Sequence, residues 1–231
     1  MTTESPNLGQ IERRSVTDEV YDLLYQRILS VDLPPGTKMS EADIAKQLGV
    51  SRQPVRDAFY RLAQFGFLNV QPQRATKVTQ ISRSAIERAR FIRTSLELEV
   101  ITIACEDLSE ANLRRLTSQL DAQREAQETG DQTAFHNLDD IFHQSICNMI
   151  DRPYAWHAIR EVKAHMDRAR FLSHAFASQT TFDDHVNIVD ALRLRDARRA
   201  RSIVRTHLDR IDGIVVRLRA KNQDWFVEDM T

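Results

Sequence analysis

The sequence predicts a mainly α-helical protein in two parts: short elements at the N-terminal end, followed by an all-helical bundle of about six or seven helices. The first observation is the placement of helix breakers. Five of the six prolines and four of the six glycines lie within residues 1–72, and only Gly130, Pro153 and Gly213 follow. The second is the helical spacing of apolar side chains beyond residue 81. So long a stretch with so few breakers must be mostly helix.

Composition is that of a globular chain, with 42% hydrophobic residues, 28% charged residues and a net charge of −1. Residues 52–77 nevertheless carry five basic side chains against one acid, which suits a nucleic-acid contact surface. Cys105 and Cys147 form no metal-binding pair motif, as is typical of a reduced, cytoplasmic protein. The polar opening MTTESPNLGQ lacks a signal-peptide core, so residues 1–14 are expected to be a flexible arm. No apolar run is long enough to cross a membrane.

Residues 15–80 are predicted to hold three helices and a hairpin. Apolar side chains from Val20 to Leu29 have helical spacing, and the turn LPPG at 33–36 ends that helix. The sequence S-E-A-D from Ser40 opens a second helix, which Gly49 stops. Ser51 is expected to cap a third helix that runs to about Gln64. The β-like runs at 67–71 and 76–80 flank the turn P-Q-R-A.

Two short helices joined by L-G-V-S and followed by a hairpin predict a winged helix–turn–helix. The first turn of its second helix points at base edges in the major groove. Arg52 and Arg56 share one face there and can grip guanine or phosphate, and Gln53 can pair with adenine. Taken singly, such side chains would only solvate a surface helix, but the turn and hairpin favour DNA binding. The predicted DNA contacts are Ser51, Arg52, Gln53, Arg56, Arg74 and Lys77.

The stretch LPPGTKMSEADIAKQLGVSRQPVRDAFYRLAQFGFL resembles the GntR family of bacterial transcription regulators. The patterns P-G-x-x-x-S-E, L-A-x-x-L-G-V-S-R-x-P-V-R and R-L-x-x-x-G-x-L recur in order, with Ile44 in the first leucine position. The resemblance implies that Arg52 and Arg56 contact an operator. The chain departs from the family at Ala42, where many members have arginine, and in the glycine-free wing tip at 73–76.

Residues 81–222 are predicted to form a helical effector-binding and dimerisation domain. Ser109, Asp131 and Asp196 stand at N-cap positions. Residues 223–231 are expected to be a C-terminal tail. The predicted helices are 82–107, 110–128, 132–150, 154–175, 181–194 and 197–220.

Three of these helices carry a histidine on the apolar stripe. Asp139 and His143 lie one turn apart on one stripe, and His185 and His207 lie on two others. A lone histidine in such a place is more often a hydrogen-bonded core residue. Four polar side chains facing one core could instead satisfy one another through a cation. Spacing alone leaves both interpretations open. His136 is the rival ligand, Asp140 has no assigned role, and the histidines at 157, 165 and 174 are expected on the surface or at a pocket rim.

The helical part resembles the FCD-type ligand-sensing domain of the FadR-like branch of that family. The residues that carry the resemblance are R-x-x-L-E from Arg93, L-D-x-x-F-H at 138–143, H-x-x-I-x-x-A-L from His185 and D-A-R-R-A-R…H-L at 196–208. In metal-binding members the ligands match Asp139, His143, His185 and His207. The resemblance therefore implies a divalent metal ion, and three histidines with one carboxylate suit Zn²⁺, Ni²⁺ or Mn²⁺.

Arg93 falls in register with an apolar stripe. It could pair with Glu97 one turn on, or point into the bundle and bind a carboxylate with two hydrogen bonds. The family, whose effectors are often small organic acids or sugar acids, favours the second. We therefore expect a cytoplasmic homodimer that reads two operator half-sites and represses a catabolic operon until an acid binds. The competing hypothesis is a metal-dependent enzyme acting on a small organic acid, with an appended DNA-binding domain.

Overall fold

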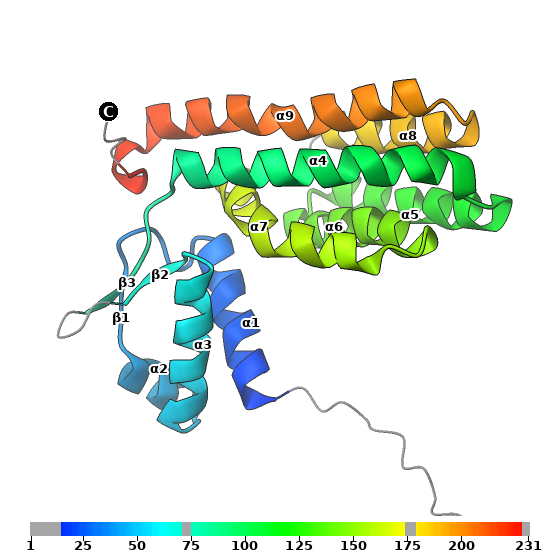
Figure 1. The fold of residues 1–231 in the computed structure, drawn as a ribbon. Coiled ribbons are helices and arrows are strands. Elements are labelled where there is room, and N and C mark those ends of the chain that lie inside the picture. The colour runs from blue at the N-terminus through cyan, green and yellow to red at the C-terminus, as the bar shows by residue number, and fades with distance from the viewer. Residues whose placement is uncertain (1–14, 71–74, 174–178, 228–231) are drawn as a thin grey trace, which may run out of the picture.

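The computed structural model describes residues 15–70, 75–173 and 179–227. A small N-terminal domain lies beneath one end of a long helical bundle (Figure 1). This arrangement confirms the predicted mainly α-helical class and its division into short elements followed by long helices. None of the helices in the described ranges has the length and apolar character needed to cross a membrane.

The N-terminal domain packs three helices against a small antiparallel sheet. Its core is built from buried side chains of the first and third helices, including Leu24, Ile28, Val55 and Phe59. The hairpin predicted from the sequence is present as β2 with β3, and a third strand, β1, pairs with the other edge of β3. The elements are α1 (Val16–Leu29), β1 (Lys38–Met39), α2 (Glu41–Leu48), α3 (Arg52–Gln64), β2 (Leu68–Asn69) and β3 (Thr76–Val78).

The ends of α2 follow the sequence rules, and the start of α3 does not. Ser40 accepts a hydrogen bond from the Asp43 amide, and Gly49 ends α2 with φ +66°. Ser51 stands at the N-cap of α3, but its side chain makes no capping hydrogen bond, so that part of the prediction is wrong. The reason is Pro54 at the third helical position, where the amide that an N-cap hydroxyl usually binds is missing.

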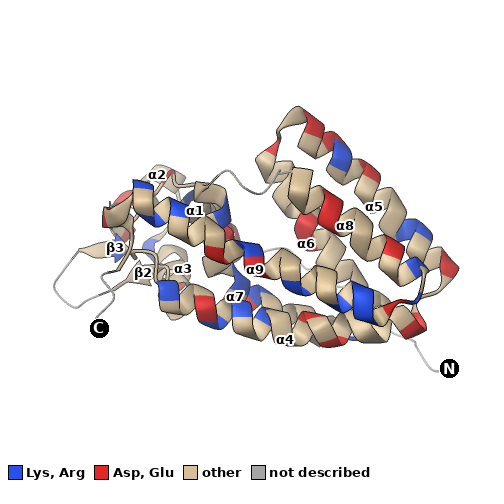
Figure 2. Ribbon diagram, turned by 90° about the horizontal axis from the view of Figure 1, so that it is seen from above, with Lys and Arg blue, Asp and Glu red and all other residues tan. Residues whose placement is uncertain are grey.

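The bundle contains the six predicted helices within the described residues. Their ends differ from the predicted ones by at most three residues. Lys, Arg, Asp and Glu are intermixed along the outer faces of α4 and α9 (Figure 2). The helices are α4 (Arg83–Asp107), α5 (Glu110–Thr129), α6 (Gln132–Met149), α7 (Pro153–Leu172), α8 (Gln179–Arg193) and α9 (Ala197–Lys221).

The segment after α9 packs back onto the start of the bundle. Residues 223–225 form a short 3₁₀ helix, and Phe226 forms a parallel bridge with Ile81. Phe226 is buried in a cluster with Ile86 and Ile214. The expected C-terminal tail therefore begins with a packed turn, and residues 228–231 lie outside the described part of the chain.

Candidate metal centre and nucleic-acid interface

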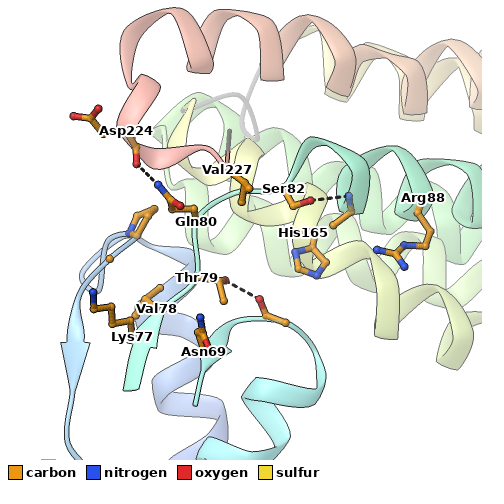
Figure 3. A pocket seen from close by; sticks show the side chains of 14 residues that line it. Asn69, Lys77, Val78, Thr79, Gln80, Ser82, Arg88, His165, Asp224 and Val227 are labelled. Atoms are coloured by element: carbon orange, nitrogen blue, oxygen red, sulfur yellow. Dashed lines mark hydrogen bonds between the residues drawn. The ribbon is translucent and has the colours of Figure 1, made fainter. Parts of the chain in front are cut away.

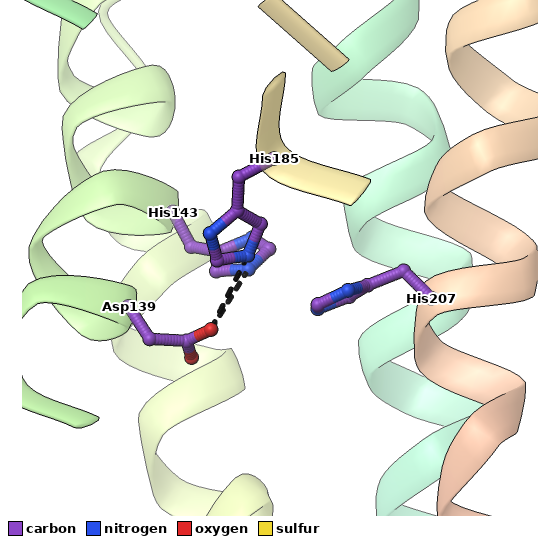
Figure 4. A group of neighbouring side chains, drawn as sticks. All are labelled: Asp139, His143, His185 and His207. Atoms are coloured by element: carbon purple, nitrogen blue, oxygen red, sulfur yellow. Dashed lines mark ion pairs between the residues drawn. The ribbon is translucent and has the colours of Figure 1, made fainter. Parts of the chain in front are cut away.

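Four buried side chains from three helices converge inside the bundle. α6 supplies Asp139 and His143, α8 supplies His185 and α9 supplies His207 (Figure 4). One ligand atom from each lies within 4.8 Å of the other three. All four residues are at most 4% exposed. The structure thus brings together the four residues predicted as metal ligands.

The outward-facing Nδ1 atom of each histidine is held by an oxygen from a different helix. Such bonds fix the ring orientation and the tautomer, and leave Nε2 as the free lone pair. The Asp184 carboxylate is itself held by two hydrogen bonds from Arg210, at 2.8 and 2.9 Å. The pairs are His143 with Glu97 Oε2 at 2.8 Å, His185 with Gln123 Oε1 at 2.7 Å and His207 with Asp184 Oδ2 at 3.3 Å.

The inward-facing atoms are buried and make no hydrogen bond with any described residue. They are Nε2 of the three histidines and both carboxylate oxygens of Asp139. His185 Nε2 and Asp139 Oδ1 lie 3.3 Å apart. Buried polar atoms are normally paired, so this convergence of lone pairs calls for a cation. Three imidazole nitrogens and one carboxylate suit a borderline divalent ion, so the residues fit the predicted metal.

The electrostatics of the centre favour the protonation states that bind a metal. Burial lowers the pKa of His207 to about 3. Burial also lowers the pKa of His185, although contact with Asp139 opposes that change. For Asp139, burial raises the pKa, but His185 and His143 together bring it well below its usual range. Near neutral pH, His185 and His207 are therefore neutral and Asp139 is ionised, as metal ligands must be.

Arg93 shows both features that the sequence left as alternatives. It is fully buried, and its Nε donates to Glu97 Oε1 at 2.5 Å. Its Nη1 and Nη2 atoms are buried and make no hydrogen bond among the described residues. The second oxygen of Glu97 holds His143, so one carboxylate links Arg93 to the centre.

The rival ligand His136 does not join this centre. It belongs to a second acidic group with Asp140 and Asp167. The ammonium of Lys163 contacts both carboxylates, at 2.8 Å from Asp140 Oδ1. That group therefore already holds a cation of its own. Of the other histidines, His157 is exposed, His165 is half-buried against Phe67, and residue 174 lies outside the described residues.

The exposed face of α3 carries the predicted DNA contacts. Arg52, Gln53 and Arg56 are all exposed. Arg56 Nε lies 3.3 Å from Glu41, and Gln53 donates to Asp57 at 2.8 Å. Both contacts are between solvated groups and are weak.

The wing carries one further described basic side chain. Lys77 is exposed on β3, opposite Lys38 of β1. Arg74 lies outside the described residues. The contact of any of these side chains with DNA stays a prediction.

Sequence reasoning missed the residues that orient the histidines. The one-turn spacing between Arg93 and Glu97 predicted their ion pair, but it gave no sign that Glu97 also holds His143. Asp184 precedes His185 directly, but neighbours in a helix point in different directions, so adjacency carried no signal. Gln123 lies 62 residues from its partner His185 and has no local signature.

A cavity of about 640 Å³ lies at the junction of the two domains (Figure 3). Its lining includes Lys77 and Thr79 from the wing segment, Arg88 from α4 and His165 from α7. None of the four convergent residues of Figure 4 lines it. The chemistry of the convergent lone pairs, rather than cavity size, therefore identifies the candidate metal centre.

Comparison with known proteins agrees with this architecture. Residues 16–78 match bacterial regulatory proteins of the gntR family, and residues 89–210 match the FCD domain. The HTH-type transcriptional repressor RspR of Escherichia coli (strain K12) is 34% identical over 216 residues, covering 93% of this chain and 95% of that protein. A probable D-xylose utilization operon transcriptional repressor of Paenarthrobacter nicotinovorans is 29% identical over 207 residues, covering 86% and 88%.

A solved structure shows the same fold. E. coli McbR/YncC matches with a TM-score of 0.74 and 25% identity, covering 89% of this chain and 99% of that one. The family and these relatives are transcriptional regulators rather than enzymes, which decides against the competing enzyme hypothesis. The chain belongs to the GntR family of bacterial transcription regulators, with a GntR helix–turn–helix domain followed by an FCD domain.

Proposed function

We propose that this regulator is a cytoplasmic, homodimeric repressor whose FCD domain holds a divalent metal ion and a small organic or sugar acid. Residues 15–80 read the operator, and residues 81–222 sense the acid and dimerise. The metal assignment is supported by four buried side chains that converge with ligand atoms free of hydrogen bonds. The Nδ1 atom of each histidine is held by a hydrogen-bonding oxygen on the opposite side of the ring. Asp139, His143, His185 and His207 would hold Zn²⁺, Ni²⁺ or Mn²⁺.

The acid would bind between the metal and Arg93. When bound, the ion supplies positive charge and open coordination positions to a carboxylate oxygen. Arg93 adds a buried guanidinium with two nitrogens free to donate, the geometry that suits a carboxylate. The name of one relative refers to D-xylose utilization, which supports a signal from carbon-source metabolism.

Operator binding would use α3 and the wing. Ser51, Arg52, Gln53 and Arg56 would face the major groove, with Lys77 and Arg74 against phosphate or the minor groove. One recognition helix reads only a few base pairs, so two copies would bind half-sites about 34 Å or a multiple apart. Acid binding would change the relative placement of the two DNA-binding domains in the dimer, and the protein would release the operator.

The metal assignment is tested by His143→Ala. The variant should lose the ion, while His157→Ala, which removes an exposed histidine from α7, should keep it. The measurement is the metal content of purified protein by elemental analysis, with circular dichroism to show that both variants fold. Full metal content in folded His143→Ala protein would refute the proposed centre.

A further inference from the structure

Two consecutive residues of α6 connect the metal centre to a different helix. Asp139 faces the histidines, whereas the Asp140 carboxylate faces α7 and lies 2.8 Å from the ammonium of Lys163. Arg170, two turns further along α7, lies 3.9 Å from Asp139 itself. α7 is therefore tied at two points to the segment of α6 that carries the candidate ligands.

Lys163 is a buried cation fixed between two carboxylates. It is 2% exposed and contacts Asp167 on its own helix as well as Asp140 on α6. Burial lowers the pKa of its ammonium, but Asp140 and Asp167 raise it more, so the group stays charged. Breaking a buried ion pair by removing one partner is costly, so this contact holds α6 and α7 in one register.

The two residues that follow Lys163 belong to the packing of the DNA-binding domain. Ala164 is buried in the same apolar cluster as the core of that domain. The His165 ring stacks on Phe67 with ring centroids 4.9 Å apart and planes 20° apart. The Phe67 ring in turn makes an edge-to-face contact with Tyr25 of α1, with ring centroids 5.6 Å apart. Three successive residues of α7 thus lead from the acidic group beside the centre to the DNA-binding domain.

The His165 ring also lies beside the turn that precedes Phe67. A Cβ atom built at Gly66 would lie 3.4 Å from the ring, at ordinary van der Waals contact. Figure 3 shows the ring at the domain junction, between Thr79 of the wing segment and Arg88 of α4. The stack of His165 on the buried Phe67 is the packed contact through which a displacement of α7 would reach the N-terminal domain.

We propose that Lys163 is the positioning residue through which the metal centre controls the DNA-binding domain, with His165 as the output contact. This inference rests on the proposed metal site and names how that site is read out. Occupancy of the centre fixes Asp139, Asp140 follows on the same helix, and Lys163 sets the position of α7 against Phe67. The link is a coupling free energy between two binding sites, so metal and DNA affect each other's affinity by the same factor.

The test measures that factor with Zn²⁺ alone as the probe. The DNA is a fragment selected by the wild-type protein from a random pool, and its Kd is measured with and without Zn²⁺. Asp140→Asn is the main variant because Lys163 keeps Asp167 as a partner. His165→Leu cuts the same path at its other end. The matched control is Glu87→Gln, which removes the partner of an exposed pair with Arg83 on α4.

In the wild type, Zn²⁺ should change the DNA Kd by about fivefold or more, the usual scale of such coupling. In Asp140→Asn and His165→Leu the ratio should fall toward one, with the Zn²⁺ Kd within about threefold of wild type. Glu87→Gln should keep the wild-type ratio. Wild-type ratios in both path variants would overturn the inference, as would a wild-type protein that binds Zn²⁺ without any change in DNA Kd. A wild-type protein that binds none of Zn²⁺, Ni²⁺ and Mn²⁺ would instead refute the proposed metal function, and the coupling with it.

Discussion

Gln123 offers a sharp test of the candidate centre, because its side chain holds one of the four convergent residues, His185, by a hydrogen bond. Its amide is fully buried on α5, and its Oε1 lies 2.7 Å from His185 Nδ1. Its Nε2 donates to the Leu138 carbonyl at 3.1 Å. Gln123→Leu keeps a side chain of similar size and removes both bonds. It leaves the ring of His185 without the acceptor that orients it.

The magnitude follows from the groups left unpaired. The His185 Nδ1–H loses its buried acceptor, at about 1–3 kcal/mol, whereas the Leu138 carbonyl keeps its backbone hydrogen bond within α6. Stability should therefore fall by roughly 1–3 kcal/mol. Zn²⁺ affinity should fall about 10- to 100-fold, because the ring loses the bond that fixes its tautomer.

The assay is a chelator competition for Zn²⁺ at a temperature where the variant is folded, together with a thermal melt. Gln119→Leu is the matched control. Gln119 lies one turn earlier on α5 and donates to Ser145 Oγ of α6 at 2.8 Å, away from the four convergent residues. The Gln119→Leu variant should lose stability but keep the wild-type Zn²⁺ affinity. Wild-type Zn²⁺ affinity in Gln123→Leu, or an equal loss in Gln119→Leu, would refute the reasoning.

Three further predictions concern DNA, stability and pH. Arg52→Ala should cost about 1–3 kcal/mol of operator binding; an unchanged footprint would contradict it. Arg168 is 1% exposed with no acidic partner among the described residues, and burial lowers its pKa to about 10. Arg168→Met should therefore increase the free energy of unfolding by up to roughly 3 kcal/mol and raise the melting temperature; a lower melting temperature would count against this account. In metal-free protein, the pKa of His207 falls from 6.5 to about 3 on folding. The unfolded chain therefore takes up that proton first, so stability is full above about pH 6.5 and declines toward pH 3; urea melts of His207→Leu should show a flatter decline.

The helices were predictable because their signals are local. Glycine and proline placement marks the ends, and the apolar stripes repeat within each helix. The same stripes show which face of a helix is buried, which is why the spacing of Asp139, His143, His185 and His207 was enough to group them as residues facing one core. What a stripe cannot show is which atoms of buried side chains meet. The braces from Gln123 and Asp184 depend on how α5, α8 and α9 pack.

Other features could not be predicted, either because two local sequence signals conflicted or because the element was too short to show a repeating pattern of apolar residues. Ser51 has the right residue type for a cap, but Pro54 removes the amide that the cap would bind. β1 spans two residues, too few to show alternation. Phe226 reads as part of a polar tail, and only its pairing with Ile81 reveals a packed turn. His136 shares a helix face with Asp139 but turns to Asp140 and Asp167 instead.

The central claim is that one divalent ion binds among the four convergent side chains. The most direct measurement is anomalous diffraction from crystals of the metal-loaded protein, with data collected on both sides of the ion's absorption edge. The account predicts one peak about 2.0–2.2 Å from Nε2 of His143, His185 and His207 and from a carboxylate oxygen of Asp139. A peak beside His136 and Asp167, or no peak among the four residues, would contradict it.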